Sequence, residues 1–263
     1  MADRVFTVEK PLVGMIHLLP LAGSVRYKQQ GPKPIVDAAL RDLYALESGG
    51  VDAVLVENLN DVPYAKEVPR ETVAMMAVVI ERLAEKTHVP IGINVLRNDG
   101  LAAMSIAAAT GATFIRVNVF AGVAFADQGI IEGQARELAW LKRDLGTDTK
   151  VLVDVHVKHA AHLTILEEAA IDAARNAPDA LIVSGIGTGR RTDPEDLQMV
   201  KSAVDLPVFI GSGVRIDNLA TYRDADGFIV GTTLKEDGRL GGPIDVERVR
   251  ALADAVASLR SSE

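Results

Sequence analysis

The sequence alternates short β-branched runs with longer helical segments along its whole length, and this repeat constrains its fold most strongly. Most of the short runs are continuously apolar, which is typical of parallel strands covered on both faces. The segments between them have the apolar spacing of helices. The predicted strands are residues 12–17, 53–57, 91–95, 114–119, 151–157, 180–183, 208–210 and 227–230. The predicted helices include residues 35–47, 70–86, 101–110, 134–145, 163–176, 194–204 and 246–259.

Two architectures accommodate such a repeat, a closed barrel and an open doubly wound sheet. No Gly-x-Gly-x-x-Gly turn follows the first predicted strand, where a dinucleotide-binding sheet would carry it. Polar residues also end several different strands, as the active site of a barrel requires. The chain of 263 residues has no composition break or Ser/Gly-rich linker. We therefore predict an α/β fold in which residues 1–263 form a single (β/α)8 TIM barrel domain.

The composition excludes several classes of partner. A net charge of −8 argues against a nucleic-acid-binding protein, which would need clustered Lys and Arg. The chain has no cysteine, so disulfides and thiolate metal sites are excluded, and we expect a cytoplasmic protein. Neither a signal peptide nor an apolar run long enough for a transmembrane segment is present, although peripheral contact with a membrane stays open. We expect a homo-oligomer on general grounds.

Glycine-rich turns follow the sixth, seventh and eighth predicted strands, at residues 184–190, 211–215 and 231–233. In barrels, the loops after strands seven and eight often bind phosphate, because small residues let a ligand approach backbone N–H groups. Alternatively, these glycines only turn the chain from strand to helix. Arg190, Arg215 and Lys235 follow the turns and could either reach a phosphate or be solvated surface charges. The residues predicted to hold a phosphate group are Gly187, Gly211, Ser212, Gly213, Gly231 and Thr232.

The fifth predicted strand alternates valines with Asp154, His156 and Lys158. If the valines face the helices, the three polar side chains line the mouth of the barrel and could perform acid–base chemistry. Asp154 and His156 could instead bind a divalent metal, or all three could form a buried network of ion pairs. Lys158 could in principle form a Schiff base with a carbonyl substrate, which would require a depressed pKa.

Polar residues at the other strand ends complete a ring around the predicted mouth. Arg116 shares one side of its strand with Asn118. The full catalytic set that we predict is Asp154, His156, Lys158, Glu57, His17, Asn94 and Asn118. An alternative metal site would use the nitrogen and oxygen donors of His17, Glu57, Asp154 and His156, which suit zinc, manganese or iron.

The motifs around these residues resemble those of the BtpA/SgcQ family, and the similarity runs from about Leu12 to Val256. Ala22 and Tyr64 depart from the family pattern, which commonly has proline and phenylalanine there. The resemblance implies a barrel of the ribulose-phosphate-binding type. Cyanobacterial members are linked to photosystem I accumulation as thylakoid-associated factors, and other members lie beside sugar-metabolism genes. The matching motifs are residues 14–21, 49–58, 61–64, 93–99, 116–118, 154–159 and 231–235.

These observations support three functional hypotheses. The leading one is an enzyme that acts on a small phosphorylated metabolite, such as a sugar phosphate or a phosphoribosyl compound. Isomerase, lyase and glycosyl-bond-cleaving activities all fit its predicted side chains. The second is a metal-dependent barrel enzyme, and the third is a non-catalytic factor of the photosystem I biogenesis type. The fold alone does not separate them, because barrels host many functions.

Overall fold

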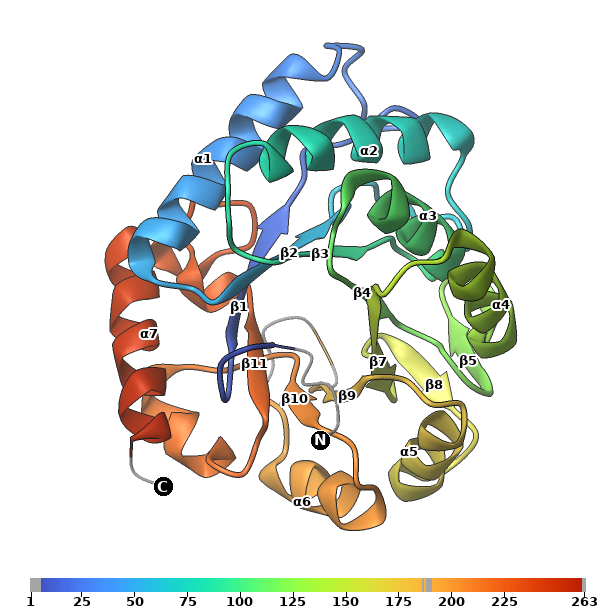
Figure 1. Ribbon diagram of the computed structural model, residues 1–263, viewed down its shortest axis with the longest axis vertical. Coiled ribbons are helices and arrows are strands. Elements are labelled where there is room, and N and C mark those ends of the chain that lie inside the picture. The colour runs from blue at the N-terminus through green and yellow to red at the C-terminus, as the bar shows by residue number, and fades with distance from the viewer. Residues whose placement is uncertain (1–5, 186, 188–190, 262–263) are drawn as a thin grey trace.

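The computed structural model describes residues 6–185, 187 and 191–261, and Figure 1 shows a ring of strands surrounded by helices. Eight parallel strands close in the order β1-β11-β10-β9-β7-β4-β3-β2, so the predicted barrel is confirmed. The ring strands are β1 (Leu12–His17), β2 (Ala53–Glu57), β3 (Ile91–Asn94), β4 (Phe114–Val117), β7 (Lys150–Val155), β9 (Ala180–Val183), β10 (Val208–Ile210) and β11 (Gly227–Val230).

Helices return the chain from strand to strand and cover the outside of the ring (Figure 1). The helix predicted to begin at residue 194 does begin there, and Asp193 caps it, since its side chain accepts a hydrogen bond from the amide of Glu195. A 3-10 helix, rather than an α-helix, joins β10 to β11. Within the described parts of the chain, no helix is long and apolar enough to cross a membrane. The helices are α1 (Lys33–Gly49), α2 (Arg70–Ala84), α3 (Gly100–Thr110), α4 (Ala135–Leu145), α5 (Leu166–Arg175), α6 (Pro194–Ala203), α7 (Val246–Arg260), η1 (Ile216–Tyr222), η2 (Thr232–Leu234) and η3 (Glu236–Gly238).

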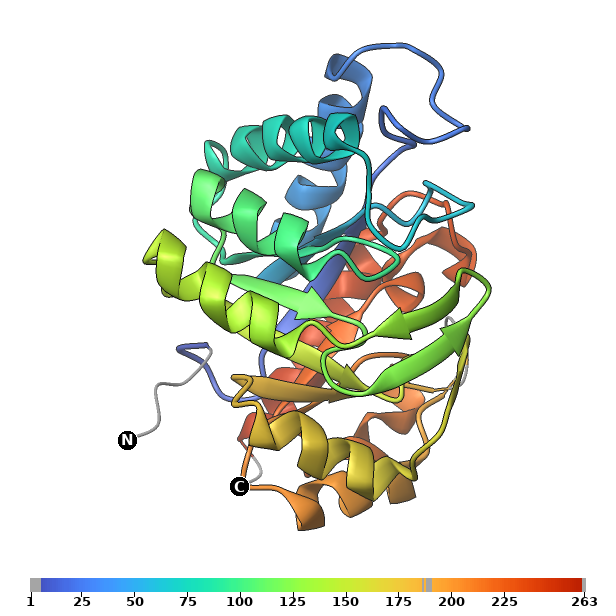
Figure 2. The same cartoon turned by 90° about the vertical axis from the view of Figure 1, so that its right-hand side faces the viewer.

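A small antiparallel sheet that was not predicted from the sequence lies beside the barrel (Figure 2). It consists of β5 (Val123–Ala126), β6 (Gly129–Glu132) and β8 (Ala160–His162), in the order β6-β5-β8. The β5–β6 hairpin occupies the connection between β4 and α4, and β8 lies between β7 and α5. As a result β4 and β7 each end two residues earlier than predicted, and α5 begins three residues later.

Apolar side chains fill the interior of the ring, as is usual for a barrel of this size. Phe6 packs against Phe114 and Phe209, with ring centroids 5.2 Å and 5.8 Å away. Because Phe6 precedes β1, this aromatic cluster closes the end at which the strands begin. Polar side chains are therefore left to the opposite end. A second, larger apolar cluster packs the outer face of the strands against the helices.

Gly92 provides the space for one of these rings, because a Cβ at this position would lie 2.1 Å from Cε2 of Phe114. We expect Gly92→Ala to lower the free energy of unfolding by about 1–3 kcal/mol, the usual cost of overpacking a core. Phe114→Leu should relieve the clash, so the double variant should be more stable than the sum of the two single changes predicts. Urea denaturation of the four proteins measures this coupling. Strict additivity would show that the ring does not limit this position.

Candidate active site

The carboxyl ends of the strands surround a cavity of about 540 Å³, which we call the mouth cavity. This is the end of a barrel at which enzymes carry their active sites. Nine of the predicted site residues line it, namely His17, Glu57, Asn118, Lys158, Gly211, Ser212, Gly213, Gly231 and Thr232. Asn94, Asp154, His156 and Gly187 lie elsewhere: the first two are buried beside the cavity, and Gly187 is buried in the loop after β9.

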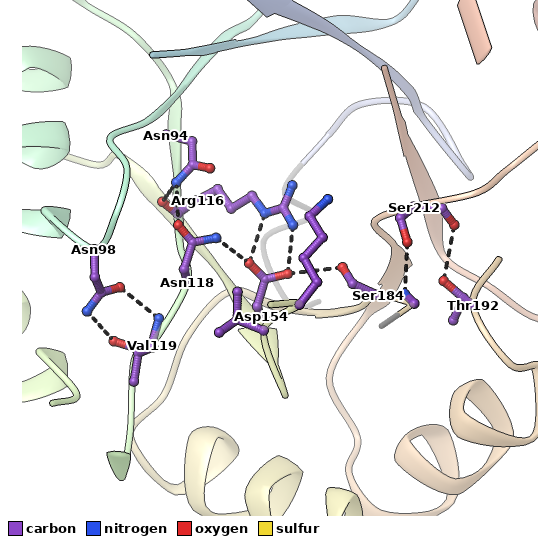
Figure 3. Close-up of polar contacts among 12 residues, drawn as sticks. Asn94, Asn98, Arg116, Asn118, Val119, Asp154, Ser184, Thr192 and Ser212 are labelled. Carbon is purple, nitrogen blue, oxygen red and sulfur yellow. Dashed lines mark hydrogen bonds and ion pairs between the residues drawn. The ribbon is translucent and has the colours of Figure 1, made fainter. Parts of the chain in front are cut away.

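The glycine turns after β10 and β11 are held to each other and to the loop after β9. Oγ1 of Thr233 donates to the carbonyl of Val214 at 2.7 Å, which joins the turn after β11 to that after β10. The amide of Gly185 donates to Oγ of Ser212 at 2.8 Å, and Oγ1 of Thr192 donates to the Ser212 carbonyl at 3.1 Å (Figure 3). The turns after β10 and β11 are therefore connected to each other and to the described part of the loop after β9, and both of these turns line the mouth cavity.

Glycine is favoured in this wall for two physical reasons. Gly213 has a φ of +70°, a conformation that L side chains rarely adopt. A Cβ on Gly231 would lie 3.2 Å from Cε1 of His17, so a larger residue would crowd the imidazole. The amides of Gly213, Thr232 and Thr233 donate no hydrogen bond to any residue that the structure describes. Backbone N–H groups of this kind are the usual donors to a bound anion.

The cations predicted to accompany the turns do not reach the mouth cavity where they can be placed. Arg190 lies outside the described residues. Arg215 is exposed and pairs with Asp217, with 3.0 Å between Nε and Oδ1. Lys235 is buried, and its Nζ donates to the carbonyl of Gly242 at 2.9 Å. Arg215 and Lys235 are thus engaged by the protein itself.

Asp154 is the centre of a buried hydrogen-bond network (Figure 3). Arg116 donates to both of its carboxylate oxygens, from Nε at 3.0 Å and from Nη2 at 2.8 Å. Asn118 and Ser184 also donate to it, at 2.7 Å and 3.3 Å. Asn94 supports the network from β3, because its amide donates to the Arg116 carbonyl and to Oδ1 of Asn118. The expected position of Asp154 on the cavity surface is therefore wrong, since four donors surround its carboxylate.

The predicted place of His156 at the mouth is also wrong. β7 ends at Val155, and His156 has a φ of +56°, so the strand alternation does not continue through it. Its ring stacks on that of His162, with centroids 4.3 Å apart, and lines a separate cavity of about 200 Å³. Burial and the neighbouring His162 lower the pKa of His156. The left-handed conformation of His156 changes the direction of the chain after β7. Lys158 lines the mouth cavity and His156 does not.

The four candidate metal ligands do not converge. Asp154 is held by Arg116, and His156 lies in the other cavity. His17 and Glu57 are neighbours, with 4.0 Å between Nε2 and Oε1. Across residues 6–185, 187 and 191–261, no three His, Cys, Asp or Glu side chains are grouped so that they could hold a metal ion. The predicted ligand set for a metal is therefore not assembled.

Three of the predicted catalytic groups that line the mouth cavity have shifted pKa values. Burial raises the pKa of the Glu57 carboxyl, although Arg116 and Lys158 oppose the shift. Burial also lowers the pKa of the Lys158 amine, and Arg116 adds to this effect, while Glu57 and Asp154 oppose it. The pKa of His17 is lowered to about 3 by burial and by the charges of Lys235 and Lys158. His17 is therefore neutral at neutral pH, and its contact with Glu57 is not an ion pair.

Several residues of the mouth cavity were not among the predicted site residues. Arg97 follows β3, and its Nη2 donates to the backbone carbonyl of Lys158 at 2.7 Å. The available signal was the family resemblance, because its motifs contain Tyr64, Arg97, Arg116, His159 and Thr233. Arg26, Asn60 and Asp127 lie outside these motifs. The added lining residues that carry polar side chains are Arg26, Asn60, Tyr64, Arg97, Arg116, Asp127, His159 and Thr233.

Known proteins resemble this chain over nearly its full length. It is 49% identical over 255 residues to an uncharacterized protein of Thermococcus kodakarensis, covering 96% of this chain and 97% of that protein. It is 41% identical over 260 residues to the photosystem I biogenesis protein BtpA of Synechocystis, covering 97% and 90%. It is 36% identical over 264 residues to the putative sgc region protein SgcQ of Escherichia coli, covering 98% of each.

Solved structures share the fold at low sequence identity. Phosphoribosyl anthranilate isomerase from Thermus thermophilus aligns with a TM-score of 0.58 at 14% identity, covering 95% of this chain and 99% of that one. Thiamine phosphate pyrophosphorylase from Pyrococcus furiosus gives a TM-score of 0.54 at 16% identity, covering 96% of each chain. Such low identities show a common barrel architecture and nothing finer.

The model of the BtpA family matches residues 8–258. This match spans all eight ring strands, both glycine turns and the polar groups of the mouth cavity. Together with the named relatives, it shows that the chain belongs to the BtpA family.

Proposed function

We propose that this protein is an enzyme that acts on a small phosphorylated metabolite, such as a sugar phosphate or a phosphoribosyl compound. One observation carries the proposal. The 211–213 turn and the 231–233 turn line the same cavity as Glu57, Lys158 and His17. An anion-binding wall and groups with perturbed pKa values are thus within reach of one ligand.

The phosphate group of the substrate would lie against the two glycine turns. β10 and β11 are the last two strands of the ring, and the loops after these strands are the frequent phosphate site of barrels. The amides of Gly213, Thr232 and Thr233 are unused by the described protein and would donate to the phosphate oxygens. A volume of about 540 Å³ suits a small metabolite. The names of the two structural neighbours, which refer to phosphorylated compounds, support the same class.

The charge of the mouth cavity also favours an anion. Arg26, Arg97 and Lys158 line it, against the carboxyl groups of Glu57 and Asp127. Arg116 also lines it, but its charge is balanced by Asp154. Burial raises the pKa of Glu57, which reduces the negative charge that this side chain contributes. The guanidinium groups of Arg26 and Arg97 would therefore attract an anionic substrate to the cavity.

The reacting part of the substrate would lie beside Glu57, Lys158 and His17. A carboxyl group with a raised pKa is a proton donor near neutral pH, and an amine with a lowered pKa can accept a proton or attack an electrophile. Neutral His17 can hydrogen-bond to the substrate without adding charge. Proton transfer in an isomerase or lyase, or cleavage of a glycosyl bond, is compatible with these groups.

The phosphate site can be tested with Thr232→Asp, which places a carboxylate at the 231–233 turn. We expect the affinity for inorganic phosphate and for ribose 5-phosphate to fall by about tenfold or more, since one tenfold change corresponds to about 1.4 kcal/mol. Isothermal titration calorimetry measures the two dissociation constants.

Ser202→Asp is the matched control, because it adds the same charge at an exposed position on α6. It should bind both ligands as the unchanged protein does. Equal affinities in Thr232→Asp and Ser202→Asp would remove the turn from the phosphate site. A crystal soaked in phosphate should show the anion at both turns.

The neutral state of His17 predicts a pH dependence of stability. Its pKa is about 3 in the folded protein and 6.5 as a model value, so between these pH values the unfolded chain binds more protons. Its contribution to folding is therefore intact above pH 6.5 and is lost as the pH falls toward 3. Relative to His17→Gln, the unchanged protein should lose up to about 1.4 kcal/mol for each pH unit in this window. Urea denaturation at several pH values measures the difference, and His88→Gln, at an exposed position, should show none.

A further inference from the structure

We propose that Lys158 is a nucleophile that forms an imine with the carbonyl carbon of a phosphorylated aldehyde or ketone bound in the mouth cavity. This inference rests on the proposed function for the class of ligand, and it adds the covalent step and the functional group that the substrate must carry. It is drawn from the surroundings of the Lys158 side chain.

The amine of Lys158 is not used to stabilise the fold. Lys158 is half-buried, and lysines are rarely withdrawn from water unless they are paired. Among the residues that the structure describes, no hydrogen bond or ion pair reaches Nζ of Lys158, which lines the mouth cavity. Lys235 gives the contrast, because it is 2% exposed and its Nζ donates to the Gly242 carbonyl and lies 3.9 Å from Asp42. Lys235 has a structural role, whereas the amine of Lys158 is left for a ligand.

The carboxylates near Lys158 are not available to neutralise it. Asp154 accepts hydrogen bonds from Arg116, Asn118 and Ser184. Glu57 contacts His17 across 4.0 Å and makes no ion pair with Lys158. The backbone of Lys158 is nonetheless held in place, since Nη2 of Arg97 donates to its carbonyl. The side chain therefore projects from a fixed point into the cavity.

The charges around Lys158 favour its neutral, nucleophilic form. Burial and the guanidinium of Arg116 lower the pKa of the amine, and Arg97 adds to this, although Glu57 and Asp154 oppose it. A neighbouring cation is one of the ways in which enzymes activate a lysine for attack on a carbonyl group. The guanidinium groups that lower the pKa of Lys158 would also attract the anionic substrate. Substrate binding and activation of the lysine would then depend on the same charges.

Lys158 and Glu57, which both line the cavity, supply the electron pair and the protons that imine formation needs. The lone pair of neutral Nζ forms a bond to the carbonyl carbon, the C=O π electrons pass to oxygen, and one proton moves from nitrogen to that oxygen. In the resulting carbinolamine, the nitrogen lone pair then expels the hydroxyl group. Glu57, whose carboxyl pKa is raised by burial, donates a proton to this hydroxyl group, which leaves as water. The products are a protonated imine on Lys158, one water molecule and the Glu57 carboxylate.

Pyridoxal 5′-phosphate is a suitable probe, because it carries an aldehyde and a phosphate group on a small ring. The full chain would be incubated with it, reduced with borohydride and digested, and the modified lysines identified by mass spectrometry. We expect the label on Lys158 and none on Lys235, which serves as an internal control. Lys158→Arg keeps a long polar side chain but removes the nucleophilic amine, so it should lose the label and still bind inorganic phosphate.

The phosphate site and the imine are separated by a second comparison. In Thr232→Asp, labelling by pyridoxal 5′-phosphate should fall about tenfold or more, as phosphate affinity does, while labelling by pyridoxal should be unchanged. Labelling of Lys158 that is equal in both proteins would support the imine and contradict the phosphate site. Binding that inorganic phosphate displaces, without a label on Lys158, would overturn the imine and leave the phosphate site intact. A label spread over exposed lysines would overturn the imine as well.

Discussion

The buried ion pair between Arg116 and Asp154 determines the character of the mouth cavity. It joins neighbouring strands β4 and β7 inside the ring, where water does not screen either charge. Such a pair contributes little net stability, because desolvation offsets much of the attraction, but removing one partner is strongly destabilising. Asn118 and Ser184 complete the hydrogen bonds of the carboxylate. The pair is thus best understood as a fixed arrangement of charges rather than as a source of stability.

The Arg116–Asp154 pair affects which titratable groups of the cavity are left without a charged partner. With Asp154 engaged by Arg116, the carboxyl groups that line the cavity are those of Glu57 and Asp127, and burial raises the pKa of Glu57. Lys158 then lies among guanidinium groups without a carboxylate partner, which favours its neutral form. The glycine turns add backbone donors to the same cavity. In the function that we propose, these turns would bind the phosphate group, while Glu57 and Lys158 would take part in the chemistry.

The barrel and the glycine turns could be predicted from the sequence because both depend on local pattern. Continuous apolar runs identify the strands, and Gly231 is required where the chain approaches His17. The errors arose where position depends on contacts distant in sequence. His156 follows the predicted alternation until its own left-handed φ breaks it. The role of Asp154 depends on Arg116 from another strand, and the sheet formed by β5, β6 and β8 consists of runs too short to show a period.

The aromatic cluster of Phe6, Phe114 and Phe209 has a consequence for turnover. It blocks the ring at the end where the strands begin, so small molecules cannot pass through the molecule. In the enzyme that we propose, substrate and product would therefore both pass through the mouth cavity. A product that keeps its phosphate group would have to leave the glycine turns before the next molecule could bind. Such a product would compete directly with the incoming substrate, and its departure would limit how fast successive cycles follow one another.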